Sequence, residues 1–146
     1  MATTIKYRMT DGDEDLAPGK SHSDDAGFDL RSREGSAIEP AHRKMVPTGL
    51  FLELPEGWEA QVRPRSGLAA KSGITILNSP GTIDAGYRGE VCVILYNTGE
   101  EVFTIARGDR IAQLVVQKLP NIDLVAAESL NDSHRGDGGF GSTGVN

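Results

Sequence analysis

The chain has 146 residues, enough for one domain with a hydrophobic core, and its 38% apolar and 25% charged residues are ordinary for a globular protein. Its formal net charge of −6 excludes a global positive field that would attract nucleic acid or an anionic membrane. The N-terminus has no signal-peptide core, the longest apolar run (91–96) is too short for a membrane span, and the single cysteine forbids an internal disulfide, so a reducing cytoplasm is expected.

Short stretches of alternating apolar residues predict β-strands along most of the chain. In chain order they are TTIKYRM (3–9), LFLEL (50–54), WEAQV (58–62), EVCVILYN (90–97), EVFTIA (101–106) and RIAQLVVQKL (110–119). The stretch 90–97 is apolar on both faces, which indicates a central strand. Turn sequences such as NSPGT and NTGEE separate the strands. Many short strands divided by turns predict an all-β sandwich or jelly roll.

Three segments lack this alternation. The acidic stretch DGDEDLAPGKSHSDD (11–25) predicts a solvated loop. The stretch SGLAAKSG (66–73) contains good helix formers and ends in a glycine, which predicts one short helix of about two turns. The glycine-rich end from Asn131 onward is expected to be flexible when alone.

Metal-dependent and covalent chemistry receive no support from local motifs. The three histidines show no metal-ligand spacing, and one cysteine cannot build a zinc site, so any metal is expected to be a hard cation that arrives with a phosphate ligand. No G-x-S-x-G elbow is present. The segment around Lys71 lacks the preceding glycine and the parallel-strand context of a phosphate-binding P-loop.

Anion binding is better supported. Arg65, Ser66 and Gly67 stand at a strand-to-helix junction, where free backbone N–H groups and a guanidinium suit phosphate oxygens. The alternative is a surface arginine before a capped helix. Gln113 would share the core face of its strand, so it needs a polar partner, which could equally be a backbone neighbour.

Asp84 and Tyr87 follow the turn at Pro80 and precede a strand. They could orient a water and press a flat ring on a ligand. They could equally be a turn cap and a core residue. Cys92, inside the following strand, is by itself a small buried strand residue.

Five motifs together point further: AGFDL (26–30), PRSGLAAK (64–71), GTIDAGYRGE (81–90), GDRIAQL (108–114) and RGDGGFGSTG (135–144). In this order they resemble the five motifs of the trimeric dUTP diphosphatase (dUTPase) family, from about residue 17 to the end of the chain. Five motifs in register are hard to obtain by chance, so the joint match favours the functional reading of each.

The resemblance implies an all-β distorted jelly-roll sandwich or barrel with one short helix. It implies a homotrimer whose three active sites lie at subunit interfaces. Residues 1–133 would form the core, and residues 134–146 a flexible glycine-rich arm that closes over a neighbouring subunit's site.

The implied reaction is hydrolysis of dUTP to dUMP and pyrophosphate with Mg²⁺, which keeps uracil out of DNA and supplies dUMP for dTMP synthesis. By the same resemblance, Asp84 orients and activates the water that attacks the α-phosphorus. Asn78 faces uracil with an amide that both donates and accepts. Tyr87 packs under deoxyribose and leaves no room for a 2′-hydroxyl.

The remaining implied roles fall into three groups. Backbone groups would read the base edge at Gly81, Thr82, Ile83 and Cys92. The phosphate chain would be held by Arg65, Ser66, Gly67 and Gln113, with Asp29 contacting Mg²⁺ through water. In the arm, Phe140 would stack on uracil, while the terminal phosphate would be held by Arg135, Gly141, Ser142 and Thr143.

Two other functions compete with this interpretation. A dCTP deaminase of the same fold would carry a catalytic glutamate near the fifth motif, and RGDGGFGSTG has none. The other is a non-catalytic binding module switched by dUTP, and the intact Asp84 and Tyr87 argue against such an inactive site.

Overall fold

The computed structural model describes residues 1–146, and nearly all of its regular elements are β-strands. The strands are β1 (Lys6–Met9), β2 (Phe28–Arg31), β3 (Ser36–Ile38), β4 (Arg43–Glu53), β5 (Trp58–Arg63), β6 (Ile74–Ile76), β7 (Gly81–Ile83), β8 (Glu90–Asn97), β9 (Phe103–Ile105) and β10 (Arg110–Lys118). The other elements are the helix α1 (Ser66–Ser72) and the 3₁₀ turn η1 (Glu14–Leu16). The prediction of a mostly β chain with one short helix is confirmed.

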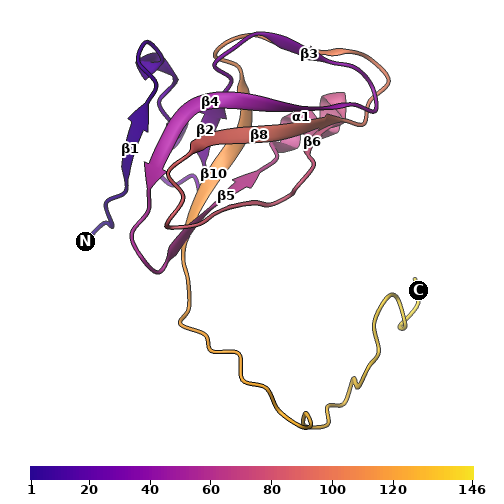
Figure 1. The fold of residues 1–146 in the computed structure, drawn as a ribbon. Coiled ribbons are helices and arrows are strands. Elements are labelled where there is room, and N and C mark those ends of the chain that lie inside the picture. The colour runs from indigo at the N-terminus through magenta and orange to yellow at the C-terminus, as the bar shows by residue number, and fades with distance from the viewer.

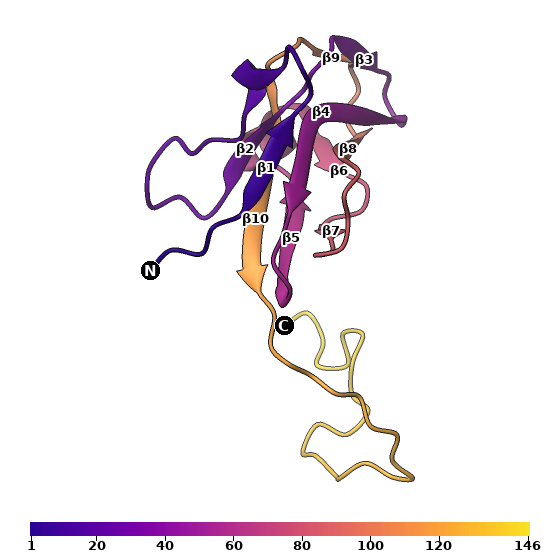
Figure 2. The same cartoon turned by 60° about the vertical axis from the view of Figure 1, so that its left-hand side comes forward.

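Two four-stranded antiparallel sheets form the body of the molecule. One has the strand order β1-β4-β8-β6 and the other β2-β10-β5-β7, with β3 and β9 pairing as a small third sheet (Figures 1 and 2). A continuous cluster of 20 buried apolar side chains fills the space between the sheets. Val46 and Val93 contribute from the first sheet, and Ala60 and Leu114 from the second. Alternation along each strand places these side chains on the inner face.

The predicted strand positions hold, with one large extension. The strand expected at 50–54 begins at Arg43, because the chain stays paired through an irregularity between Pro47 and Phe51. Gly49 lies in that irregularity with φ +74°, a conformation that favours glycine. The stretch 90–97 is an inner strand, β8, between β4 and β6.

The acidic segment is not a solvated loop throughout, so that prediction is wrong for part of it. Leu16 ends the turn η1 and joins the hydrophobic core at 3% exposure. Asp13 is 7% exposed. Its carboxylate can be buried because Arg33 and Arg107 lie beside it, 2.8 Å and 3.0 Å away.

Helix α1 ends where the sequence predicts. Gly73 caps it in the left-handed region at φ +65°, and its N–H donates to the carbonyls of Leu68 and Ala69. A Cβ at Gly73 would lie 2.9 Å from Thr98 Oγ1, so space as well as conformation favours glycine there.

Beyond β10 the chain leaves the body as an arm without helix or strand (Figures 1 and 2). Its apolar side chains are exposed, among them Ile122, Leu124, Leu130 and Phe140. No helix of the chain has the length and hydropathy needed to cross a membrane.

Candidate active site

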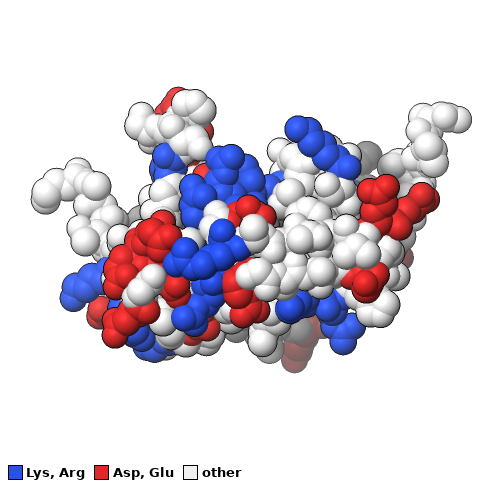
Figure 3. Space-filling view, turned by 90° about the horizontal axis from the view of Figure 1, so that it is seen from above, with Lys and Arg blue, Asp and Glu red and all other residues white.

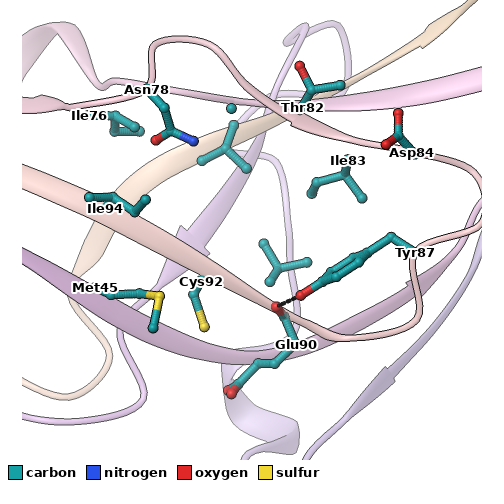
Figure 4. Close-up of a pocket in the computed structure, with 13 residues that line it drawn as sticks. Met45, Ile76, Asn78, Thr82, Ile83, Asp84, Tyr87, Glu90, Cys92 and Ile94 are labelled. Atoms are coloured by element: carbon teal, nitrogen blue, oxygen red, sulfur yellow. Dashed lines mark hydrogen bonds between the residues drawn. The ribbon is translucent and has the colours of Figure 1, made fainter.

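A cavity of about 410 Å³ opens between β7 and β8 (Figure 4). Seven residues singled out from the sequence line it: Asn78, Gly81, Thr82, Ile83, Asp84, Tyr87 and Cys92. The remaining lining comes from Met45, Val62, Ile76, Glu90, Val91 and Ile94. We call this space the hairpin cavity.

The cavity exists because β7 and β8 belong to different sheets. β7 pairs with β5, where Gly81 lies opposite Val62, while β8 pairs with β4 and β6. Two strands of one hairpin are therefore pulled to opposite layers, and a gap opens between them. The backbone of β7 has its own sheet partner on one side only, so its other edge can meet a flat ligand.

Asn78 and Gly81 shape the end of the cavity next to β6. A Cβ at Gly81 would lie 3.3 Å from both Asn78 Nδ2 and Val62 Cβ, so glycine lets the Asn78 amide lie close to the strand. The Asn78 side chain makes no hydrogen bond within the chain, which leaves its donors and its acceptor for a ligand.

Asp84 and Tyr87 stand at the other end. The Tyr87 hydroxyl donates to the backbone carbonyl of Glu90 at 2.9 Å, which fixes the ring at the cavity mouth (Figure 4). Tyr87 is 47% exposed, so it is not a core residue. The Asp84 carbonyl accepts the Tyr87 N–H at 3.1 Å, but the carboxylate accepts no hydrogen bond and is not a turn cap. Both alternatives from the sequence are excluded.

A second cavity, of about 290 Å³, gathers the charged residues. It contains Asp29, Arg65, Ser66, Gly67 and Gln113 from the sequence interpretation, together with Ser21, Asp25, Ala26, Gly27 and Arg110. We call it the arginine cavity. Strand β2 supplies Asp29, the β5–α1 junction supplies Arg65, and β10 supplies Gln113.

Asp29 lies between two guanidinium groups. Its Oδ1 is 3.9 Å from Arg65 Nε, and its Oδ2 is 3.7 Å from Arg110 Nη1. Arg65 also donates to the Arg110 carbonyl at 3.0 Å, so it is held in the cavity and is not a free surface side chain. The arrangement sets two guanidinium groups around the Asp29 carboxylate, and the Asp25 carboxylate lines the same cavity.

Gln113 has a backbone partner, as its alternative proposed. Its Nε2 donates to the Pro64 carbonyl at 3.0 Å, and the amide fills the space above Gly27, where a Cβ would lie 2.6 Å from Oε1. It still lines the cavity. Both observations hold because the amide ties β10 to the start of the β5–α1 junction from inside the cavity.

The hairpin and arginine cavities share no lining residue. A single chain therefore presents the base-facing and phosphate-facing groups in two separate places. The arm joins neither cavity: Phe140 is fully exposed, and the Arg135 Nε donates to the Gly138 carbonyl at 2.6 Å. The structure likewise leaves Gly141, Ser142 and Thr143 in exposed turns.

Cys92 is half-buried, so the expectation of a buried strand residue is wrong, because this side chain faces the hairpin cavity and not the core. Partial burial and a neighbouring carboxylate change its chemistry. Desolvation raises the pKa of its thiol, and Glu90 raises it further. The thiol is therefore a weak nucleophile at neutral pH. No group of three or more His, Cys, Asp and Glu side chains is arranged to hold a metal by itself.

Arg110 and Glu90 are among the cavity-lining residues to which sequence reasoning assigned no role. Arg110 lies inside GDRIAQL, and a cation in a motif with other phosphate-facing residues could have suggested it. Glu90 ends GTIDAGYRGE, but its contacts are to Gly49 and Arg33, which are distant in the sequence. Nothing local could have indicated them.

Comparisons with known proteins point to the dUTPase family. A model of the dUTPase family matches residues 14–144. Deoxyuridine 5′-triphosphate nucleotidohydrolases of Caulobacter vibrioides and Clostridium tetani are 51% identical over 146 residues and 49% identical over 141 residues, and each alignment covers 97% of this chain. These alignments cover 94% and 97% of the two relatives.

Solved structures of dUTPases are also similar to this chain. A mutant dUTPase of Staphylococcus bacteriophage 80alpha with dUpNHpp superposes with a TM-score of 0.89 at 27% identity, covering 99% of this chain and all of that one. A mutant dUTPase from phage phi11 of S. aureus, described with a structural Mg(II) ion, gives a TM-score of 0.80 at 25% identity, covering 87% of this chain and 98% of that one.

Proposed function

Since this chain belongs to the dUTPase family, we infer that it hydrolyses dUTP to dUMP and pyrophosphate. The observation that carries this inference is the hairpin cavity, a slot between two diverging strands with a free amide at one end and a free carboxylate at the other. Hydrolysis of dUTP keeps uracil out of DNA and supplies dUMP for dTMP synthesis.

The hairpin cavity is proposed to take the nucleoside. Asn78 and the backbone of Gly81, Thr82, Ile83 and Cys92 would bind the edge of uracil. The slot is lined by Ile76 and Ile94, which suits a flat pyrimidine. Tyr87 would lie against deoxyribose, and its fixed ring would leave no space for a 2′-hydroxyl.

Asp84 is proposed to hold the attacking water. Its carboxylate lines the cavity and has no partner within the chain, so it can accept a hydrogen bond from that water. Orientation of the water toward the α-phosphorus would supply much of its contribution. The O–P bond to the α-phosphorus forms as the bond to the departing pyrophosphate breaks.

The arginine cavity is proposed to take the phosphate chain. Arg65, Arg110 and the amides at Ser66 and Gly67 would neutralise charge on the phosphate oxygens as it develops. The donor set fits Mg²⁺ carried by the substrate: Asp29 offers hard oxygens through water, and the chain provides no metal cage. When bound, Mg²⁺ would supply further charge neutralisation on the phosphates.

A homotrimer would reunite the two cavities. Because one chain presents them separately, we propose that the hairpin cavity of one subunit faces the arginine cavity of a neighbour. The two sheets would be a distorted jelly roll, and residues 134–146 would close over a neighbouring site. There Phe140 would stack on uracil, and the terminal phosphate would be held by Arg135, Gly141, Ser142 and Thr143. We place the enzyme in the cytoplasm.

Substitution of Asp84 tests the chemistry. The Asp84→Asn variant keeps size and hydrogen-bonding capacity but loses the carboxylate, so it should bind dUTP normally and lose about a thousandfold in kcat. Equilibrium binding and single-turnover pyrophosphate release would be measured side by side. A variant with the wild-type kcat would show that Asp84 does not serve the water.

A further inference from the structure

Asp13 is the one charged residue among the buried residues of the chain. Its Oδ1 accepts from Arg107 Nη2 at 3.0 Å. Its Oδ2 lies 2.8 Å from Arg33 Nε but outside hydrogen-bonding geometry, so that contact is electrostatic. A buried carboxylate needs such partners, because its desolvation is otherwise unfavourable.

Arg33 joins Asp13 to the rim of the hairpin cavity. Its Nη1 lies 3.6 Å from Glu90 Oε1, and the same oxygen accepts the Gly49 N–H at 2.8 Å. A Cβ at Gly49 would lie 3.0 Å from Asp13 Oδ2, so Gly49 packs directly on that carboxylate. Asp13, Arg33, Glu90 and the Gly49 backbone therefore form one connected set, here called the Asp13 cluster.

The Asp13 cluster reaches Tyr87 through the backbone of Glu90. The Glu90 carbonyl accepts a hydrogen bond from the Tyr87 hydroxyl (Figure 4). The Glu90 side chain is held by Arg33 and by the Gly49 N–H. Tyr87 also covers Gly89, where any Cβ would collide with the ring. The ring is thus packed against the start of β8, and the Glu90 side chain joins that part of the chain to Gly49 of β4.

We propose that Glu90 is a positioning residue for Tyr87, and that Asp13 acts through Arg33 to hold it. The cluster would thereby set how strongly the enzyme prefers a 2′-deoxyribose over a ribose. Exclusion of one hydroxyl by contact requires the ring to stay within a fraction of an ångström, which a side chain on a loose loop cannot ensure. This inference rests on the proposed role of Tyr87.

The test is the ratio of kcat/KM for dUTP to that for UTP. Glu90→Ala should lower the ratio about tenfold, because the ring loses its support, while kcat for dUTP falls less. Glu90→Gln keeps the acceptor for Gly49 and should restore part of the ratio. Asp13→Asn should lower it in the same direction. Asp15→Asn is the matched control: Asp15 pairs only with Arg107 at an exposed position, and its loss should leave the ratio unchanged.

A double-mutant comparison of Glu90 and Tyr87 distinguishes a positioning role of Glu90 from a general loss of stability. Tyr87→Phe removes the hydroxyl that joins the ring to Glu90, so Glu90→Ala should lower the ratio much less in the Tyr87→Phe background than in the wild type. Additive effects would contradict the proposal. A purely structural role would lower the melting temperature of Glu90→Ala and leave its ratio intact, which would also overturn it.

Tyr87→Ala separates this inference from the proposed function. If Tyr87→Ala lowers the ratio and Glu90→Ala does not, the positioning role is wrong and the role of Tyr87 stands. If neither changes the ratio, the role of Tyr87 is wrong and the inference falls with it. Glu90 is only partly buried, so Glu90→Ala decides the question even if Asp13→Asn fails to fold.

Discussion

The thiol of Cys92 reports on the hairpin cavity, because it is the only cysteine of the chain and lines that space. Burial, and then Glu90, raise its pKa, so the thiolate fraction at neutral pH is smaller than that of a free cysteine and grows as the pH rises. Iodoacetamide at pH 7.5 should modify Cys92 at least about threefold more slowly than free cysteine. Bound dUMP should slow the reaction further.

Mass spectrometry would follow this alkylation, with Cys92→Ser as the blank. Modification at the rate of free cysteine, unaffected by dUMP, would show that the cavity is not the nucleoside site.

Residues close together in the sequence were the easiest to predict. Asp84 and Tyr87 follow β7 directly, and Cys92, from the next strand, lines the same cavity. Glu90 and Asp13 were out of reach, because their partners lie far along the chain: Gly49 is 41 residues from Glu90, and Arg107 is 94 residues from Asp13. Contacts between residues so far apart in the sequence depend on how the strands are arranged in space, and no local sequence pattern predicts them.

At the scale of elements, the long strands could be predicted, whereas several of the short ones could not. β4, β8 and β10 carry enough alternation to be recognised, whereas β3, β6 and β7 have three residues each. β7 matters most, since its pairing with β5 opens the hairpin cavity. Only the sheet assignment explains why the two strands of its hairpin diverge.

The burial of Asn97 could not be predicted from the sequence either. It ends β8 inside a sequence that reads as a turn, yet it is fully buried. Its Nδ2 donates to the carbonyls of Ile38 and Glu101, and its Oδ1 accepts the Gly99 N–H. This amide joins the small β3–β9 sheet to the main sheet. A buried amide with satisfied partners looks like any turn asparagine in the sequence.

At the scale of the whole molecule, charge gives no preference for a polyanion. On the face shown in Figure 3, Lys and Arg side chains are interspersed with Asp and Glu. Two guanidinium groups, those of Arg65 and Arg110, meet inside the arginine cavity, with the carboxylates of Asp25 and Asp29 beside them. Such a distribution favours recognition of a small phosphorylated ligand over a long nucleic acid.

The contribution of the arm to activity can be tested by deletion. Deletion of residues 135–146 should leave folding and oligomeric state unchanged, because no residue of the arm belongs to the hydrophobic core. It should lower kcat/KM for dUTP about a hundredfold. Deletion of residues 145–146 alone, beyond the fifth motif, is the control. Light scattering and steady-state kinetics would measure both properties.

Mixed oligomers would show whether sites are shared. Coexpression of the truncated chain with Asp84→Asn should recover part of the activity, since an intact arm from one chain could close over an intact Asp84 of another. Normal activity of the truncated chain alone would make the arm dispensable.

Pyrophosphate release from dUTP, dCTP, dTTP and UTP in the presence of Mg²⁺ tests the central claim most directly. The slot between β7 and β8 and the fixed Tyr87 ring predict equimolar dUMP and pyrophosphate from dUTP, with kcat/KM at least about a hundredfold lower for the other three nucleotides. Binding of dUTP without hydrolysis, or release of ammonia from dCTP, would contradict it.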